Sequence, residues 1–334
     1  MSSTPIILSV SLFLLFSCRS CQGQQMYGLV EKLKPREYSQ LGAINTRSGS
    51  THILKDLSSY GSSIGGASLD GTTGIWFVMY SKIPSDGYEI FCSMVQINLA
   101  DNSSYPLSVN VSESYCPWGI AWSETNQVVY GVSWNVRLGL QEVVIIDPTT
   151  GTTSLLTELP KKYGNIYGNS RLASLDDING IFYVVLDGYD YVGQYLYAIN
   201  VTTGDYKDYT LNADDSEWIV TSMTWDSQLD CFVGIGYKAN RGWWEFIHVS
   251  STGRITAVHH FDDATTNYIY EYNIFWLDEA SQDYYLLVSD FNQKDWYIYT
   301  FDAKTGFVIG KSFQLSCDGG VPNNECIPNH LTMY

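Results

Sequence analysis

An eight-residue pattern recurs along the chain at a nearly constant interval: three mostly apolar residues, usually an Asp or Asn, and a turn that usually ends in Gly. Its clearest copies are Val144–Gly151, Tyr197–Gly204 and Tyr299–Gly306. Weaker copies cover Gly42–Gly49, Val95–Asn102 and Phe246–Gly253. The fourth residues fall at 45, 98, 147, 200, 249 and 302, so the spacings are 53, 49, 53, 49 and 53. A period of about fifty residues predicts one large repeat domain.

Each repeat divides into four short runs rich in β-forming residues, separated by polar turns. In the third repeat these runs are residues 119–122, 128–134, 142–147 and 152–159. The same order returns in the other repeats, and no helical periodicity accompanies it. Four strands in about fifty residues are typical of one blade of a β-propeller.

The two ends of the chain together supply one further blade. Met26–Val30 resembles the second strand of a repeat, and residues 38–44 and 50–57 follow as its third and fourth strands. The segment His330–Tyr334 resembles the first strand Met223–Trp225 and fills the missing innermost place. The sequence therefore predicts an all-β fold, a six-bladed β-propeller of four-stranded antiparallel blades, closed by a composite blade from both termini.

The repeats and their Asp-x-x-Thr-Gly turns make nearly all of residues 25–334 resemble six-bladed β-propellers of the NHL, YWTD and SMP-30 types. The resemblance lies in the shape of the repeat, because the YWTD tetrapeptide and the WD40 signature are missing. It implies ligand binding at the mouth of a central channel. The SMP-30 resemblance also implies a divalent ion, such as calcium, that activates water for lactone or ester hydrolysis.

The first residues and the net charge suggest where the protein works. An apolar run at residues 6–16 is too short to span a membrane, and we interpret residues 1–24 as a signal peptide. No second apolar run is long enough for a transmembrane segment. The formal net charge of −17 argues against nucleic acid as a partner. We therefore expect a secreted protein whose one suggested cofactor is calcium.

Five cysteines remain after the predicted signal peptide is removed. Cys317 and Cys326 flank a loop and form the first predicted disulfide; Cys92 and Cys116 form the second. Cys231 is predicted to be a buried free thiol. Three N-glycosylation sequons begin at Asn102, Asn110 and Asn200.

Candidate ligand residues lie in the loops that lead into the predicted first strands, at residues 60–66, 111–118, 163–171, 214–219, 267–273 and 322–329. Aromatic side chains with a few polar groups form a plausible small-ligand or glycan site. The alternative is that these side chains pack the loops and line a wet channel. The candidates are Tyr115, Trp118, Asn169, Arg171, Glu217, Trp218, Tyr270, Glu271 and His330.

Three functions remain open. The leading hypothesis is a secreted, non-catalytic propeller that binds a protein, glycan or extracellular-matrix component. The second is a calcium-dependent SMP-30-like hydrolase, with Asn169, Glu217 and Glu271 as candidate metal ligands from three successive blades. The third is an acidic structural matrix protein that meets calcium or mineral.

Overall fold

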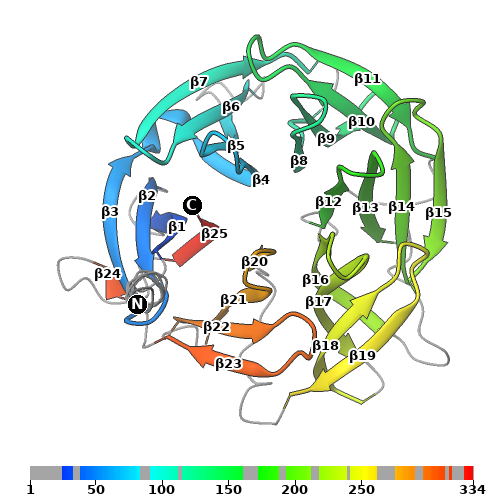
Figure 1. The fold of residues 1–334 in the computed structure, drawn as a ribbon. Helices are drawn as coiled ribbons and strands as arrows, with labels where there is room; N and C mark the ends of the chain where they lie inside the picture. The colour runs from blue at the N-terminus through cyan, green and yellow to red at the C-terminus, as the bar shows by residue number, and fades with distance from the viewer. Residues whose placement is uncertain are drawn as a thin grey trace, which may run out of the picture.

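The computed structural model shows six β-sheets arranged as blades in a ring around a common axis (Figure 1). This confirms the six-bladed propeller. The structure describes residues 25–32, 38–82, 91–111, 115–160, 172–187, 193–211, 218–238, 241–261, 275–289, 296–312, 316–317 and 327–333. The predicted signal peptide lies outside these residues. Within them, no helix is long and apolar enough to cross a membrane.

Blades 2 to 6 each contain four antiparallel strands, which follow the chain from the centre to the rim. Blade 2 consists of β4 (Ser62–Asp70), β5 (Ile75–Lys82), β6 (Phe91–Asn98) and β7 (Ser103–Val109). Blade 3 consists of β8 (Gly119–Ser123), β9 (Val128–Asn135), β10 (Leu140–Ile146) and β11 (Thr153–Glu158). Blade 4 consists of β12 (Ala173–Asp176), β13 (Ile181–Asp187), β14 (Gln194–Asn200) and β15 (Tyr206–Thr210). Blade 5 consists of β16 (Trp218–Asp226), β17 (Cys231–Lys238), β18 (Trp243–Val249) and β19 (Ile255–His260). Blade 6 consists of β20 (Phe275–Asp278), β21 (Asp283–Ser289), β22 (Trp296–Asp302) and β23 (Val308–Lys311).

Blade 1 joins the two ends of the chain, as predicted. Its sheet order is β24-β3-β2-β1-β25, from β1 (Gln25–Lys32), β2 (Tyr38–Asn45), β3 (Ser50–Asp56), β24 (Ser316–Cys317) and β25 (Ile327–Met333). The innermost strand β25 pairs antiparallel with β1, and Figure 1 shows the two side by side near the axis. One feature differs from the prediction: β24 adds a short parallel strand to the outer edge of β3. The C-terminal segment therefore contacts both edges of this blade.

The recurring sequence pattern forms the hairpin between the third and the outer strand of each blade. In blade 3, Asp147 Oδ1 accepts hydrogen bonds from the backbone N–H groups of Thr149 (2.7 Å) and Thr150 (3.0 Å). These bonds favour the ionised carboxylate, so they lower the pKa of Asp147 below its usual value. Gly151 closes the turn at φ +73°, a left-handed conformation that favours glycine. Equivalent side-chain bonds form at Asn45 and Asn200.

The copy in blade 5 is shifted by one residue from the position that the sequence spacing suggests. Ser250, rather than Val249, takes the turn position, because its N–H donates to Arg254 O as that of Asp147 donates to Thr152 O. Val249 is the last residue of β18 and is buried. This turn is one residue shorter, since Gly253 N donates directly to Ser250 O. The sequence spacing had placed the turn residue at Val249, which is instead an apolar residue of the strand.

Three predicted loops are partly strand. Residues 62–66 belong to β4, Trp218 and Ile219 open β16, and residues 327–329 open β25. In each case the inner strand extends along nearly all of its neighbour: Ser62 pairs with Ser81, Trp218 with Lys238, and Ile327 with Glu31. All three ladders contain an irregularity, which the alternation of side chains does not reveal.

Turns between the first and second strands connect neighbouring blades. The carboxylate of Glu124 in blade 3 accepts hydrogen bonds from Thr72 N and Oγ1 in blade 2. Asp177 in blade 4 likewise accepts bonds from Thr125 N and Oγ1 in blade 3. Because strands alternate in direction, these turns lie on the same face of the disc as the Asp147-type hairpins. We call this the turn face, and the opposite side the loop face.

Apolar side chains fill the spaces between adjacent blades. One cluster joins blades 3 and 4 around Tyr130, Phe182 and Tyr197; another joins blades 5 and 6 around Phe246 and Tyr284. Tyr284 is fully buried, and its hydroxyl donates to Ser222 Oγ at 2.8 Å. Stability in this fold therefore comes from contacts between blades as well as from hydrogen bonds within each sheet.

Deletion of residues 327–334 tests the closure. It removes β25 and leaves the edge of β1 unpaired, and at about 1 kcal/mol for each lost hydrogen bond the free energy of unfolding should fall by roughly 4 kcal/mol. Urea unfolding followed by circular dichroism measures the loss. Ile178→Ser, at an 80% exposed turn residue, is the control and should stay within about 0.5 kcal/mol of the parent. Equal stability of the truncated and parent chains would contradict this account of closure.

A pair of glycine substitutions tests the turn geometry. Gly151 and Gly139 both have positive φ, +73° and +64°, so alanine costs about 1–2 kcal/mol of stability at either position. A Cβ at Gly151 would also lie 2.1 Å from Ser108 O, whereas one at Gly139 meets nothing within 4 Å. Gly151→Ala should therefore lower the free energy of unfolding by about 1–3 kcal/mol more than Gly139→Ala. Indistinguishable urea midpoints would show that the backbone contact at Gly151 is unimportant.

Candidate functional site

Four of the predicted ligand residues lie in the described part of the chain, and three of them lie at or just before the start of an inner strand, on the loop face. Tyr115 is 36% exposed, next to β8. Trp118 and Trp218 are buried, at 8% and 5% exposure, between blades 3 and 4 and between blades 4 and 5. His330 is in β25, opposite Leu29 of β1. The other predicted residues lie outside the described part of the chain: Asn169, Arg171, Glu217, Tyr270 and Glu271.

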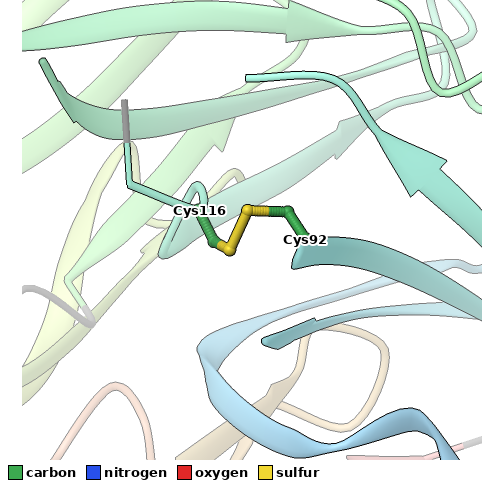
Figure 2. The surroundings of a disulfide bond; sticks show 2 residues. All are labelled: Cys92 and Cys116. Carbon is green, nitrogen blue, oxygen red and sulfur yellow. A yellow bond between two sulfur atoms is a disulfide. The ribbon is translucent and has the colours of Figure 1, made fainter. Parts of the chain in front are cut away.

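The disulfide between Cys92 and Cys116 is formed, as predicted (Figure 2). It joins the start of β6 in blade 2 to the segment that leads into β8 in blade 3, with the two Cα atoms 5.4 Å apart. The bond therefore links two blades at the loop face. For the other predicted pair, Cys317 lies in β24, and Cys326 lies outside the described residues.

Cys92 occupies a position that recurs in every blade, six residues before the turn residue of the third strand. Several residues at this position bind the next blade. Ser39 Oγ lies 2.9 Å from Tyr80 Oη, and Gln194 Oε1 accepts from Val220 N at 2.6 Å while its Nε2 donates to Val220 O at 3.1 Å. At the same position, the Cys92–Cys116 disulfide joins two neighbouring blades by a covalent bond instead of hydrogen bonds. The full set is Ser39, Cys92, Gln141, Gln194, Trp244 and Trp296.

Exposed apolar side chains gather around this disulfide. Phe91 adjoins Cys92 and is 53% exposed, and Tyr115 adjoins Cys116. The Tyr115 N–H donates to Trp134 O at 2.9 Å, which holds it beside the turn that carries Val136 (56% exposed) and Leu138. We call Phe91, Tyr115, Val136 and Leu138 the disulfide patch.

The turn within the patch is fixed by hydrogen bonds. Asn135 Oδ1 accepts from Leu138 N at 2.9 Å, and Asn135 Nδ2 donates to the buried Glu142 Oε1 at 2.7 Å. Gly139 N completes the turn by donating to Asn135 O. A disulfide on one side and a bonded turn on the other hold the apolar side chains in place before any partner binds, which reduces the entropy lost on binding.

Two histidines and the free cysteine of blade 5 lie in structural settings. His248 Nε2 lies 2.8 Å from Ala303 O, and His259 packs on Phe307 at 4.6 Å between ring centroids. Cys231 is free and half-buried, and burial together with Asp226 and Asp230 raises its pKa to about 11. It is therefore a neutral thiol at physiological pH, which is a poor nucleophile.

A metal site and glycosylation both remain predictions. The described residues contain no group of three or more His, Cys, Asp or Glu that could hold a metal ion. The three candidate calcium ligands lie outside them. Of the sequons, Asn110 is exposed, and Asn102 and Asn200 are partly exposed at turns after third strands. Asn200 Oδ1 accepts two backbone N–H bonds in its turn.

Comparisons with solved structures find the same fold. A chain of the nidogen/laminin complex matches with a TM-score of 0.59 and 10% identity, covering 92% of this chain and 97% of that one. A periplasmic gluconolactonase from Pseudomonas aeruginosa matches with a TM-score of 0.52 and 11% identity, covering 92% and 98%. A Lactobacillus plantarum protein matches with a TM-score of 0.52 and 13% identity, covering 93% and 99%. No family profile and no curated protein matches the sequence.

These matches define the class of the protein: a six-bladed β-propeller. At such low identity the likeness extends to the fold alone. Propellers of this shape include a binding protein and a gluconolactonase, so the fold does not choose between these activities.

Removal of the disulfide tests its role in joining blades 2 and 3. The Cys92→Ser/Cys116→Ser double variant should lose about 3 kcal/mol of stability, because the bond closes a loop of 24 residues. Urea unfolding of the parent with a reductant should show a loss of stability at least this large. Cys231→Ser, at the free thiol, is the matched control and should show a smaller change that the reductant does not alter. Insensitivity of the parent to reduction would contradict the assignment.

Proposed function

We propose that the protein is a secreted, non-catalytic β-propeller that binds an extracellular protein, glycan or matrix component. The observation that carries this proposal is the disulfide patch on the loop face. The disulfide itself suits an oxidising compartment, which supports secretion. Among a protein, a glycan and a matrix component, the patch favours a protein as the partner.

The chemistry of the patch explains this preference. It presents two aromatic and two aliphatic side chains, and buried aromatic anchors dominate the energy of many protein–protein interfaces. Exposed apolar groups held together in this way mark interaction sites more often than single exposed residues do. The chain carries a net charge of −17, so a partner with a basic rim around an apolar centre would be steered toward it.

Substitutions in the patch test the proposal. Tyr115→Ser and Leu138→Ser should each weaken binding to the partner by at least about tenfold, the effect of losing roughly 1.4 kcal/mol at an interface anchor. The partner is isolated on the immobilised protein from the extracellular fluid of the source, purified, and its affinity measured by surface plasmon resonance. Leu155→Ser, a 55% exposed residue on the rim of the same blade, is the matched control. Unchanged affinity in both patch variants would contradict a role for the patch.

Calcium titration separates this proposal from the hydrolase alternative. Calorimetry is performed with calcium on the parent, Glu217→Gln and Glu271→Gln, together with an assay of lactone hydrolysis. A single tight site lost in both variants, with calcium-dependent hydrolysis, would favour the SMP-30-like hydrolase. Weak binding at many sites, insensitive to both substitutions, would favour the acidic matrix protein. The non-catalytic proposal expects no calcium-dependent hydrolysis.

A further inference from the structure

The outer strand of blade 6 exposes three apolar side chains in a row. Phe307 is 58% exposed, Val308 42% and Ile309 56%. Phe307 directly precedes β23, and the other two residues open it. Successive side chains of a strand point to opposite faces of its sheet, so exposure of all three means that neither face is covered here. Contiguous exposed apolar residues of this kind mark an interaction site more often than scattered ones do.

Ile309 differs from the residues that hold the same place in other blades. In blades 1, 3 and 5, the ladder between the third and outer strands shifts register and leaves one residue unpaired: Leu54, Leu156 and Val258. All three pack against apolar clusters of the propeller. Ile309 is the corresponding unpaired residue of blade 6, yet its side chain is mostly exposed. The sequence therefore keeps a packing residue at a position where the described part of the chain does not bury it.

β23 is also the free edge of its sheet. It ends the order β20-β21-β22-β23, and Figure 1 shows it on the outside of blade 6. An edge strand pairs readily with a further strand unless charged residues, proline or a covering segment prevent it. Pro106 in β7 and the pair Lys207 and Asp208 in β15 are residues of this protective kind. The one charged residue of β23 is Lys311, at its end.

Blade 1 shows that a rim strand of this propeller accepts an additional strand. β24 pairs in parallel with β3, with Ser316 opposite Ser50 and Cys317 opposite Thr51. β3 is the fourth strand from the axis in blade 1, the place that β23 takes in blade 6. Addition of an extended segment at this place is therefore an arrangement that the fold already contains.

Positive charge flanks the exposed apolar run. The Lys311 ammonium lies 4.1 Å from the Tyr297 ring centroid, which holds it beside β23. Lys304, also exposed, lies in the hairpin that leads into the strand. Asp302, in the same hairpin, accepts from Thr305 N at 2.7 Å and from Thr305 Oγ1 at 2.6 Å, so its carboxylate is engaged within its own turn. In a chain with a net charge of −17, this edge is a local site that attracts acidic groups.

We infer that the blade 6 edge, defined as Lys304, Phe307, Val308, Ile309 and Lys311, binds an extended acidic segment of a partner protein as a fifth strand. The backbone of the segment pairs with the free edge of β23, and its apolar side chains cover the exposed ones. Its carboxylates meet the two lysines. This edge belongs to blade 6, whereas the disulfide patch belongs to blades 2 and 3, so the inference does not depend on that patch.

Fluorescence anisotropy tests the inference with three labelled peptides as probes. The first alternates Glu and Val over about seven residues, the length of an ordinary strand. The second has Lys in place of every Glu, and the third is the acidic peptide with N-methyl groups that remove the backbone donors of one edge. The acidic probe should bind, and each of the other two should bind at least about tenfold more weakly, because charge attraction or strand pairing is lost.

Substitutions at the edge locate the binding site. Ile309→Glu should weaken binding of the acidic probe by about tenfold or more, since it places a negative charge in the middle of the edge. Lys304→Glu should weaken it by about threefold and strengthen binding of the Lys probe. Leu155→Glu is the matched control, because it makes the same charge change at a 55% exposed residue of β11. Tyr115→Ser, in the disulfide patch, should bind like the parent, so failure of the protein-binding proposal leaves this test unaffected.

Two kinds of result would overturn the inference. The first is absence of binding by the acidic probe at about 1 mM protein, or equal affinity of the parent and Ile309→Glu for it. The second comes from sedimentation velocity of the parent without peptide. Self-association that Ile309→Glu abolishes, together with no binding of the acidic probe, would assign the edge to a second copy of this chain instead.

Discussion

The pairing of β25 with β1 is the interaction on which the remainder of the fold depends. Each blade packs its apolar faces against two neighbours, so a ring with one missing contact would leave both flanking blades half-covered. The chain meets this requirement with strands from its two ends, paired from Met26 to Glu31 on β1 with one register shift between Leu29 and Val30. Closure in this form converts six marginal sheets into one cooperative unit.

The two faces of the disc are built by different physical means. On the turn face, short turns use carboxylate, amide and hydroxyl oxygens to cap backbone N–H groups, and some of these carboxylates also accept bonds from the preceding blade. On the loop face, blades are joined by longer side-chain contacts, of which the Cys92–Cys116 bond is the strongest. Rigid turns on one side leave the other side free to carry recognition residues.

Much of the fold could be predicted from the sequence, because turn chemistry is local and repeats six times. Asp147 and Gly151 predict their hairpin from the local sequence alone. The copy at Ser250 was misplaced by one residue, since a shortened turn and a buried Val249 look alike in a linear pattern. The strand positions of Trp218 and Ile219 were missed because ladder irregularities follow from pairing, which sequence alternation does not encode.

The candidate sites were harder to predict, for a physical reason. The disulfide patch depends on the Cys92–Cys116 bond between blades 2 and 3, which brings Phe91 and Tyr115 together. It also depends on the hydrogen bond from Tyr115 N to Trp134 O, which holds Tyr115 beside the turn of blade 3. This grouping has no sequence spacing of its own. A signal was nevertheless available: Cys92 lies six residues before a turn residue, as Ser39 and Gln194 do, and that regularity points to a position between blades.

The strand β24 has a consequence for the order in which the protein can fold. Residues 316–317 form part of the outer edge of blade 1 and residues 327–333 form its inner edge, so this blade stays incomplete until residue 333 has been synthesised. Blades 2 to 6 contain all their strands earlier and can form hairpins while translation continues. During that interval β1 has an unpaired inner edge. Protection of that edge, by a chaperone or by rapid release from the ribosome, then becomes a requirement of biosynthesis rather than of the finished molecule.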